Sequence, residues 1–285
     1  MHRRDFITTL GSAVALTQLS CGVAKQANRG TLGKLNRVGI QLYSLRDDAR
    51  VDLERTLADI ASIGYKDVEL LGSMNNFGMP PARLREVLDR NGLSAPSTHV
   101  SADALKDLQR QITDAKILGH KYIVVASLPI AKPAKLDDYR RWADLLNAAG
   151  LTARERGIWI GFHNHADDFV KIDGQVAYDV LVERIDPDVV RLQLDTGNAA
   201  MAGYDPMDYM DRFGDRYWLF HIKDVPQLGA KTDTELGQGV IKWGPFLDSI
   251  VGIDRKEVFV EQETYPGRPI DSLRRDFEYI SKLEF

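Results

Sequence analysis

The chain of 285 residues contains a single cysteine, Cys21, near its N-terminus. The rest of the chain can therefore form no internal disulfide, and a hydrophobic core has to stabilise it, which a domain of this size is able to bury. Histidine is also scarce, with six residues in all. Because histidines are few, a cluster of them at particular places in the fold indicates a site more strongly than it would in a histidine-rich chain.

An excess of basic residues and a long apolar run are both missing. The 37 basic and 41 acidic residues are interspersed and give a formal net charge of -4, so the sequence does not indicate a nucleic-acid-binding surface. The apolar stretch of residues 7–19 is too short and too rich in small residues for a membrane span. We expect a small-molecule partner, no nucleic acid and no membrane span, and we leave a homo-oligomer open.

The first thirty residues carry an export pattern. The segment Arg3-Arg4-Asp5-Phe6-Ile7 precedes the apolar stretch, and it resembles a twin-arginine export signal. Cys21 resembles part of a lipoprotein signal, but Gln18 stands where such signals favour an apolar residue. We predict a cleavable signal and linker over residues 1–30 and a periplasmic or otherwise exported protein, with lipid anchoring at Cys21 as the alternative.

Residues 31–285 alternate between strand patterns and helix patterns. Each predicted strand is a short run rich in β-branched and aromatic residues, as in a parallel sheet that is buried on both faces. The eight predicted strands are Val38–Tyr43, Asp67–Leu71, Ser94–Val100, Lys121–Ala126, Ile158–His163, Val189–Asp195, Tyr217–Lys223 and Glu257–Gln262. Left-handed helix caps are expected where glycine falls between a helix and the next strand, at Gly64, Gly92, Gly119 and Gly157.

Apolar residues at helical spacing lie between the predicted strands. Three such faces are Leu53, Leu57, Ile60 and Ala61; Leu105, Leu108, Ile112 and Ala115; and Trp142, Leu145, Leu146 and Ala149. Regular alternation of strand and helix over about 250 residues predicts a single-domain (β/α)8 TIM barrel at residues 31–285. A doubly wound open sheet is the alternative, and the absence of a Gly-rich phosphate loop after the first strand disfavours it.

Polar residues stand at the C-terminal ends of four predicted strands. They are His163-Asn164-His165, Asp195, His221 and Glu261. In a TIM barrel these ends converge on the face that holds the active site. A single such residue is usually structural, but four in series indicate a divalent metal site. Histidine and carboxylate donors without a thiolate suit Mn²⁺, Zn²⁺, Co²⁺ or Fe²⁺ better than Mg²⁺ or Ca²⁺.

Five motifs in this order resemble the xylose-isomerase-like sugar (phosphate) isomerase/epimerase family. They are Val38–Arg46, Gly161–His165, Leu194–Asn198, Phe220–Asp224 and Val260–Glu263. The resemblance covers nearly all of residues 35–285, and it implies one divalent ion held by a glutamate, an aspartate, a histidine and a second glutamate.

The metal ligands implied by the resemblance match this chain at three of four positions. Asp195, His221 and Glu261 match the last three ligands, whereas His163 stands where many relatives have glutamate, as in a His-Asn-His branch of the family. His165 is the alternative ligand. A further departure is Asp168, where that branch often has glutamate.

The donor set supports removal of a proton next to a sugar carbonyl. A metal ion acting as a Lewis acid stabilises the enediolate that this step forms, and a nearby base takes the proton. Glu261 is the first candidate for the base and His163 the second. Lys223 is a candidate hydrogen-bond donor to the oxyanion, or alternatively a surface lysine paired with Asp224.

Further residues at strand ends are candidates for binding sugar hydroxyls, namely Gln41, Glu69, His99 and Asn198. For Glu69, the alternative is a buried partner of a basic group. Trp243 is a candidate stacking platform. The polar, glycine-flanked segment Gly229–Gly239 follows the seventh predicted strand, and we expect a long loop over the mouth that acts as a lid.

Three functions compete at this stage. The first is a metal-dependent isomerase or epimerase of an unphosphorylated sugar or keto-sugar, since sugar phosphates belong to the cytosol. The second is a metal-dependent lyase or hydratase that acts on 3-keto-glycosides through the same first step. The third is a non-catalytic carbohydrate-binding protein. A metal-dependent abasic-site endonuclease would need more ligands and a basic face, and the sequence shows neither.

Overall fold

The computed structural model describes residues 33–285, and the export pattern lies outside this described part. Eight parallel strands close a barrel in the order β1-β10-β9-β8-β5-β4-β3-β2. Their bounds are β1 (Gly39–Gln41), β2 (Asp67–Leu71), β3 (Ser97–Val100), β4 (Tyr122–Val125), β5 (Trp159–His163), β8 (Val190–Asp195), β9 (Tyr217–Ile222) and β10 (Glu257–Val260). The predicted TIM barrel is confirmed, and the open-sheet alternative is wrong because β1 pairs with β10.

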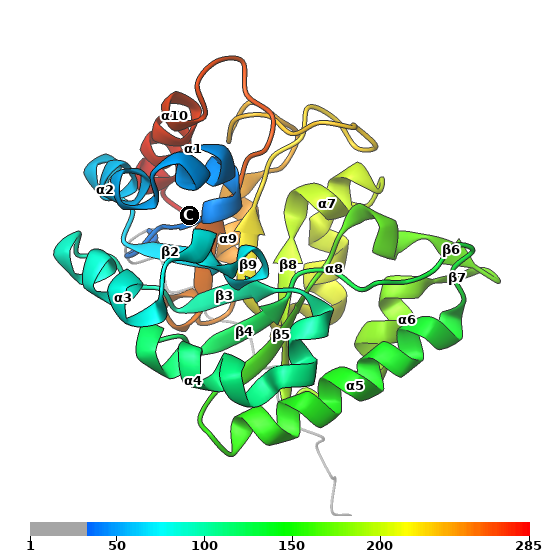
Figure 1. Cartoon of the computed structure of the whole chain (residues 1–285). Coiled ribbons are helices and arrows are strands. Elements are labelled where there is room, and N and C mark those ends of the chain that lie inside the picture. The colour runs from blue at the N-terminus through cyan, green and yellow to red at the C-terminus, as the bar shows by residue number, and fades with distance from the viewer. Residues whose placement is uncertain (1–32) are drawn as a thin grey trace, which may run out of the picture. The chain divides into compact units, whose positions relative to one another are not determined.

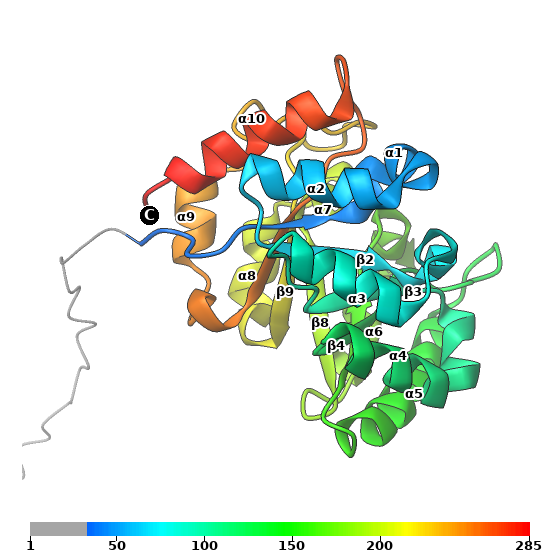
Figure 2. The same cartoon turned by 60° about the vertical axis from the view of Figure 1, so that its left-hand side comes forward.

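Helices surround the barrel (Figure 1). They are α1 (Arg46–Val51), α2 (Leu53–Ile63), α3 (Pro81–Arg90), α4 (Leu108–Leu118), α5 (Leu136–Arg154), α6 (Ala177–Arg184), α7 (Thr196–Met201), α8 (Pro206–Phe213), α9 (Trp243–Asp248) and α10 (Pro269–Lys282). The last long helix, α10, lies beside α2 in both views, so the end of the barrel chain packs against its beginning (Figures 1 and 2). A small hairpin, β6 (Lys171–Ile172) and β7 (Gln175–Val176), follows β5. No helix of residues 33–285 is long and apolar enough to span a membrane.

The helical spacing of apolar residues correctly predicted most of the buried helix faces. Leu53, Leu57 and Ile60 of α2 are buried, and the four glycines expected at helix ends all have positive φ angles. The prediction fails at Leu145, whose side chain is 53% exposed. The buried row of α5 runs through Ala143 and Leu146. Leu145 is adjacent to Leu146, about 100° around the helix, and this rotation turns it toward water.

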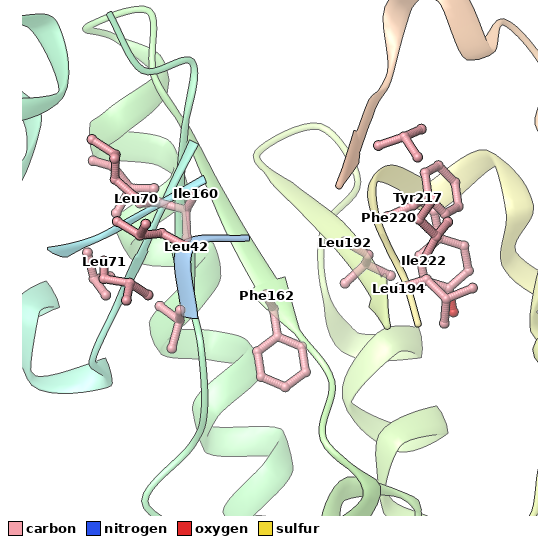
Figure 3. Close-up of a cluster of buried hydrophobic side chains, with 14 of the residues drawn as sticks. Leu42, Leu70, Leu71, Ile160, Phe162, Leu192, Leu194, Tyr217, Phe220 and Ile222 are labelled. Atoms are coloured by element: carbon pink, nitrogen blue, oxygen red, sulfur yellow. The ribbon is translucent and has the colours of Figure 1, made fainter. Parts of the chain in front are cut away.

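Alternation along the strands separates two layers of side chains. One set faces the helices and forms the main core, and Figure 3 shows part of it, including Leu70, Ile160, Phe162, Leu192, Phe220 and Ile222. The other set fills the barrel, where an apolar layer consists of Tyr122, Val124, Leu219 and Phe259. A side chain at Gly39 would put its Cβ 2.5 Å from Phe259 Cδ1, so only glycine fits there. Next to this layer, the inward positions closer to the C-terminal strand ends are polar.

A buried carboxylate on α10 predicts how stability depends on pH. Asp276 accepts a hydrogen bond from Leu236 N at 2.8 Å, and its Oδ2 has no hydrogen-bond partner among residues 33–285. Burial raises the pKa of Asp276 to about 7. The folded protein therefore retains a proton that the unfolded chain releases above about pH 4, and this linkage lowers stability as the pH rises from about 4 to 7.

We expect Asp276→Asn to raise the melting temperature at pH 8 and to have a smaller effect at pH 5. The asparagine can still accept the Leu236 hydrogen bond, and it removes an ionisation that costs about 1.4 kcal/mol per unit of pKa shift. Thermal unfolding of both proteins across this pH range measures the difference. An equal change in melting temperature at both pH values would contradict the linkage.

Candidate metal centre and active site

The predicted strand-end residues come together because their strands are neighbours in the barrel. Strands β5, β8, β9 and β10 are consecutive in the closed sheet, and Asp195 is in register with His221. One possible ligand atom each from Asp195, His221 and Glu261 lies within 4.8 Å of the others, and all three residues are buried. This geometry suits one cation that several protein groups share.

A second group of possible ligands shares His221. The ring nitrogens of His99, His163 and His221 also lie within 4.8 Å of one another. His99 was predicted to bind substrate, and the structure places its ring 5.2 Å from the ring of His221. His165 belongs to neither group within residues 33–285; it is exposed, with its ring 4.9 Å from that of His163. The geometry therefore favours His163 over His165 as the ligand from β5.

The ammonium group of Lys223 lies among carboxylates. The side chain is 1% exposed, and Nζ is 3.2 Å from Asp195 Oδ2, 2.8 Å from Glu261 Oε2 and 2.9 Å from Glu263 Oε1. The alternative of a surface lysine paired with Asp224 is therefore wrong. Gly197 makes room for this lysine, because a Cβ at position 197 would collide with the Lys223 side chain. A cation already occupies the space between two candidate ligands, so the donor set fits a positively charged ion.

The charges at the site depend on one another. Burial alone would lower the pKa of Lys223, but the carboxylates of Asp195, Glu261 and Glu263 raise it well above its usual value. Burial alone would raise the pKa of Glu261, but Lys223 and His221 hold it well below its usual range. Burial raises the pKa of Asp195, and Lys223 opposes that effect. Lys223 is therefore charged and compensates the carboxylates in the metal-free protein.

Two asparagines fix Asp195. The side chain of Asn164 bonds the backbone of Asp195 through both amide atoms, at 2.9 and 3.1 Å. Asn198 donates its backbone N–H to Asp195 Oδ1 at 2.8 Å and its side-chain amide to Oδ2 at 2.7 Å. Asn198 was predicted to bind substrate, and the structure engages its amide with a candidate ligand. Asn164 had no predicted role, although its place between two histidines pointed to the site.

The loop after β9 is fastened beside the site. Asp224 accepts hydrogen bonds from Gly237 N at 3.0 Å and Gly239 N at 3.2 Å, and it also accepts one from Trp243 Nε1 at 3.0 Å. Asp233 accepts bonds from the backbone just after Glu261. These bonds tie parts of the Gly229–Gly239 segment to the residues after β9 and after β10, and its action as a lid stays a prediction. Trp243 is buried and belongs to the core.

Gln41 and Glu69 contact each other in the interior of the barrel. Both are fully buried, and Gln41 Nε2 donates to Glu69 Oε2 at 2.7 Å. The prediction that they bind sugar hydroxyls does not fit these contacts, whereas the alternative of Glu69 as a buried partner does. Gln193 was missed by the sequence analysis, although period two from Asp195 points it inward. It hydrogen-bonds His99, His163 and Glu69.

A closed parallel barrel with buried histidines and carboxylates at its C-terminal strand ends defines a TIM-barrel protein with a potential metal site. Residues 57–283 match the sequence profile described as xylose isomerase-like TIM barrel. The chain belongs to this family, as its motifs predicted.

Three known proteins illustrate the breadth of the similarity. An inosose dehydratase from Lacticaseibacillus casei is 29% identical over 274 residues, which cover 82% of this chain and 88% of that protein. The structure of a sugar phosphate isomerase/epimerase from Parabacteroides distasonis has a TM-score of 0.76 at 24% identity, covering 88% of this chain and 99% of that one. The structure of IOLI protein with a bound zinc atom has a TM-score of 0.68 at 16% identity, covering 86% and 98%. The chain is thus similar in sequence to an inosose dehydratase, and it shares its fold with a sugar phosphate isomerase/epimerase and a zinc-binding protein.

Proposed function

We propose that this protein is a metal-dependent lyase that removes a proton next to the carbonyl of an unphosphorylated keto-sugar or keto-glycoside and then eliminates a β-substituent. One observation carries the proposal: the buried donors of Asp195, His221 and Glu261 converge, with the Lys223 ammonium between the two carboxylates. Similarity to an inosose dehydratase supports elimination as the outcome. The predicted export signal supports an unphosphorylated substrate.

Some residues of the site would bind the metal ion, and others would transfer protons. Asp195, His221, Glu261 and His163 would hold the ion, which would supply a Lewis acid that stabilises negative charge on the carbonyl oxygen. Glu261 is the first candidate to take the α-proton, and His163 is the second. Lys223 donates a hydrogen bond to the developing oxyanion. The protonated base can then return its proton to the leaving hydroxyl.

Elimination balances without an oxidant or a reductant. The base removes a proton from the carbon beside the carbonyl, and the bonding electrons form the enediolate. The oxyanion then re-forms the carbonyl, and the electrons of the enediolate double bond form a new carbon–carbon double bond and expel the β-hydroxyl. The hydroxyl leaves as water after it takes the proton back from the protonated base. The substrate loses one molecule of water and becomes an unsaturated ketone.

The test is an assay in D₂O with inosose, free sugars and 3-keto-glycosides, with and without Mn²⁺. We expect a metal-dependent unsaturated ketone from at least one keto-substrate, and no product from the ligand variant His221→Ala or after chelation. Elemental analysis of both proteins, purified without chelator, checks that the variant has lost its metal. If the metal-loaded protein yields neither deuterium exchange nor elimination, the enzymatic proposal is overturned and the carbohydrate-binding alternative gains support.

Isomerisation or epimerisation is the second candidate. Glu261 directly follows β10 and His163 ends β5, and both are among the potential metal ligands. One base could remove a proton and another return it on a different face, which epimerisation requires. The same D₂O assay distinguishes the two reactions, because an isomerase incorporates deuterium into a sugar product that retains all its hydroxyl groups.

We propose export by the twin-arginine route, which carries folded proteins and so allows metal loading before export. Replacing both Arg3 and Arg4 by lysine is expected to leave the protein in the cytoplasm. Fractionation of cells that express the wild-type and double-variant chains measures this. An unchanged periplasmic yield would argue against the route, and a lipid on Cys21 of the mature protein would show that the chain is anchored instead.

A further inference from the structure

A buried carboxylate inside the barrel contacts the candidate ligands but is not itself one of them. Glu69 lies on β2 with 0% exposure. Five side chains contact its two oxygens: Gln41 Nε2 at 2.7 Å, Ser97 Oγ at 2.6 Å, Gln193 Nε2 at 3.0 and 3.1 Å, His221 Nε2 at 2.5 Å and His99 Nε2 at 3.2 Å. These neighbours occupy both oxygens, so Glu69 can act on the side chains around it but not on a ligand.

The contact with His221 determines which of its nitrogens faces the candidate ligands. A carboxylate accepts hydrogen bonds, so the nitrogen that faces Glu69 has to carry a proton. That nitrogen is Nε2. The other nitrogen, Nδ1, lies 3.0 Å from Glu261 Oε2 and 3.9 Å from Asp195 Oδ2. Without an ion, Nδ1 therefore also carries a proton, which it donates to Glu261. A bound cation would displace this proton, while Nε2 keeps the one that it donates to Glu69, so Nδ1 is the atom of His221 available to a shared cation.

Gln193 links Glu69 to His163 and determines which nitrogen of His163 carries the proton. Its amide nitrogen donates to Glu69, so its oxygen has to face the other way. That oxygen lies 3.0 Å from His163 Nδ1 and 2.7 Å from His99 Nε2, and it accepts from both rings. A flipped amide would turn its NH₂ group toward these N–H groups and its oxygen toward a carboxylate. The proton of neutral His163 is therefore on Nδ1. In the part of the chain that the structure describes, Nε2 makes no hydrogen bond and lies 3.8 Å from Asp195 Oδ2, so its lone pair is available to an ion.

We propose that Glu69 is a positioning residue that selects the ligand nitrogen of the site histidines, directly for His221 and through Gln193 for His163. The partner of the distal nitrogen commonly sets the tautomer and ring orientation of a ligating histidine. Here one carboxylate does so for rings that come from β5 and β9, across the inside of the barrel. The inference rests on the metal site of the proposed function but not on the reaction that the protein catalyses.

Metal affinity and histidine tautomers test this role in Glu69→Gln and Gln193→Met. Glutamine at position 69 presents one acceptor oxygen in place of two, so the histidine N–H groups lose a partner. We expect the dissociation constant for Zn²⁺ to rise about 10- to 100-fold in Glu69→Gln. Calorimetry with Zn²⁺ alone measures it. Two-bond proton–nitrogen spectra of the metal-free and Zn²⁺-loaded protein identify the protonated nitrogen of each ring.

The two variants make different spectroscopic predictions. Glu69→Gln is expected to perturb the nitrogen signals of both His221 and His163. Gln193→Met removes the acceptor for His163 Nδ1–H and His99 Nε2–H but leaves the contact between Glu69 and His221 in place. We therefore expect His163 to populate both tautomers while His221 keeps its proton on Nε2. The control is Asp276→Asn, which also converts a buried carboxylate into an amide but lies on α10 away from the site. It should leave Zn²⁺ affinity and both tautomers unchanged.

The outcomes separate this inference from the proposed function. If both variants fold, keep the wild-type tautomers and bind Zn²⁺ as tightly as the control, Glu69 only fills the barrel and the inference is overturned. If Glu69→Gln does not fold, an unchanged His163 tautomer in Gln193→Met overturns it equally. If the wild-type protein itself binds no ion, the proposed metal function fails. The His163 tautomer and the His221 nitrogen signals of the metal-free variants then still decide whether Glu69 and Gln193 position the rings.

Discussion

Glu261→Gln is expected to lose nearly all turnover while the barrel still folds. Glu261 Oε2 lies 3.0 Å from His221 Nδ1 and 2.8 Å from Lys223 Nζ, at the centre of the possible ligands. The amide removes a negative charge from the metal site and also removes a base. General acid–base groups contribute about 10²–10⁴-fold to a rate, and weaker metal binding would add to that loss. The measurements are kcat, metal content and thermal unfolding.

Saturation with Mn²⁺ separates the two roles of Glu261. If the residue is only a ligand, excess metal restores the activity of Glu261→Gln. If it is also the base, kcat remains low when every site is filled. Glu263→Gln is the matched control, because Glu263 also contacts Lys223 but has a side chain that is 38% exposed. Wild-type rates in metal-loaded Glu261→Gln would show that the assigned proton-transfer role is wrong, and His163 would be the next base to test.

Lys223→Met is expected to lower kcat and to destabilise the metal-free protein. A missing oxyanion donor typically costs about 10²–10³-fold in rate. Methionine keeps much of the length of the side chain, but it leaves the carboxylates of Asp195, Glu261 and Glu263 without their shared counter-charge. Removal of one partner of a buried ion pair typically costs about 3–5 kcal/mol.

Mn²⁺ should stabilise the Lys223→Met protein more than the wild type, because the ion replaces the missing positive charge. Melting temperatures with and without Mn²⁺ measure this difference. Lys256→Met is the control: Lys256 is a half-buried lysine that donates to Tyr217 O at 2.7 Å, outside the metal site. If Lys223→Met is fully active on every substrate that Glu261→Gln fails to convert, Lys223 takes no part in the reaction. If the metal-free variant is as stable as the wild type, the counter-charge role is wrong.

Short-range patterns were sufficient to predict the barrel. The range Asp67–Leu71 was predicted with its observed bounds, and the other strands were placed within about three residues at either end. Residue identity along a strand or helix reports burial directly, since the two periodicities of 2.0 and 3.6 are fixed by backbone geometry. The same argument failed at Leu145, because four apolar residues do not show where the middle of the buried helix face lies. Only packing against the barrel showed which row of α5 is buried.

The part of the site that lies at the strand ends could be predicted from the sequence. Asp195, His221 and Glu261 could be brought together without coordinates, because parallel strands of a barrel present their C-terminal ends on one face. The burial of Lys223 could not be predicted, since a lysine after a strand is compatible with solvent or with the core. Its place became evident only when Glu263, Asp195 and the gap left by Gly197 were seen around it.

The sequence by itself determined the barrel, the family and the set of chemical groups at its mouth. Only the tertiary structure decided how those groups are oriented. Glu69 meets Gln193 across 124 residues of chain and His221 across 152. Such contacts depend on how the strands are staggered when the sheet closes, and no local period encodes that stagger. Burial then fixes the arrangement, because each polar atom inside the barrel needs a partner and few of the alternative ring and amide orientations provide one.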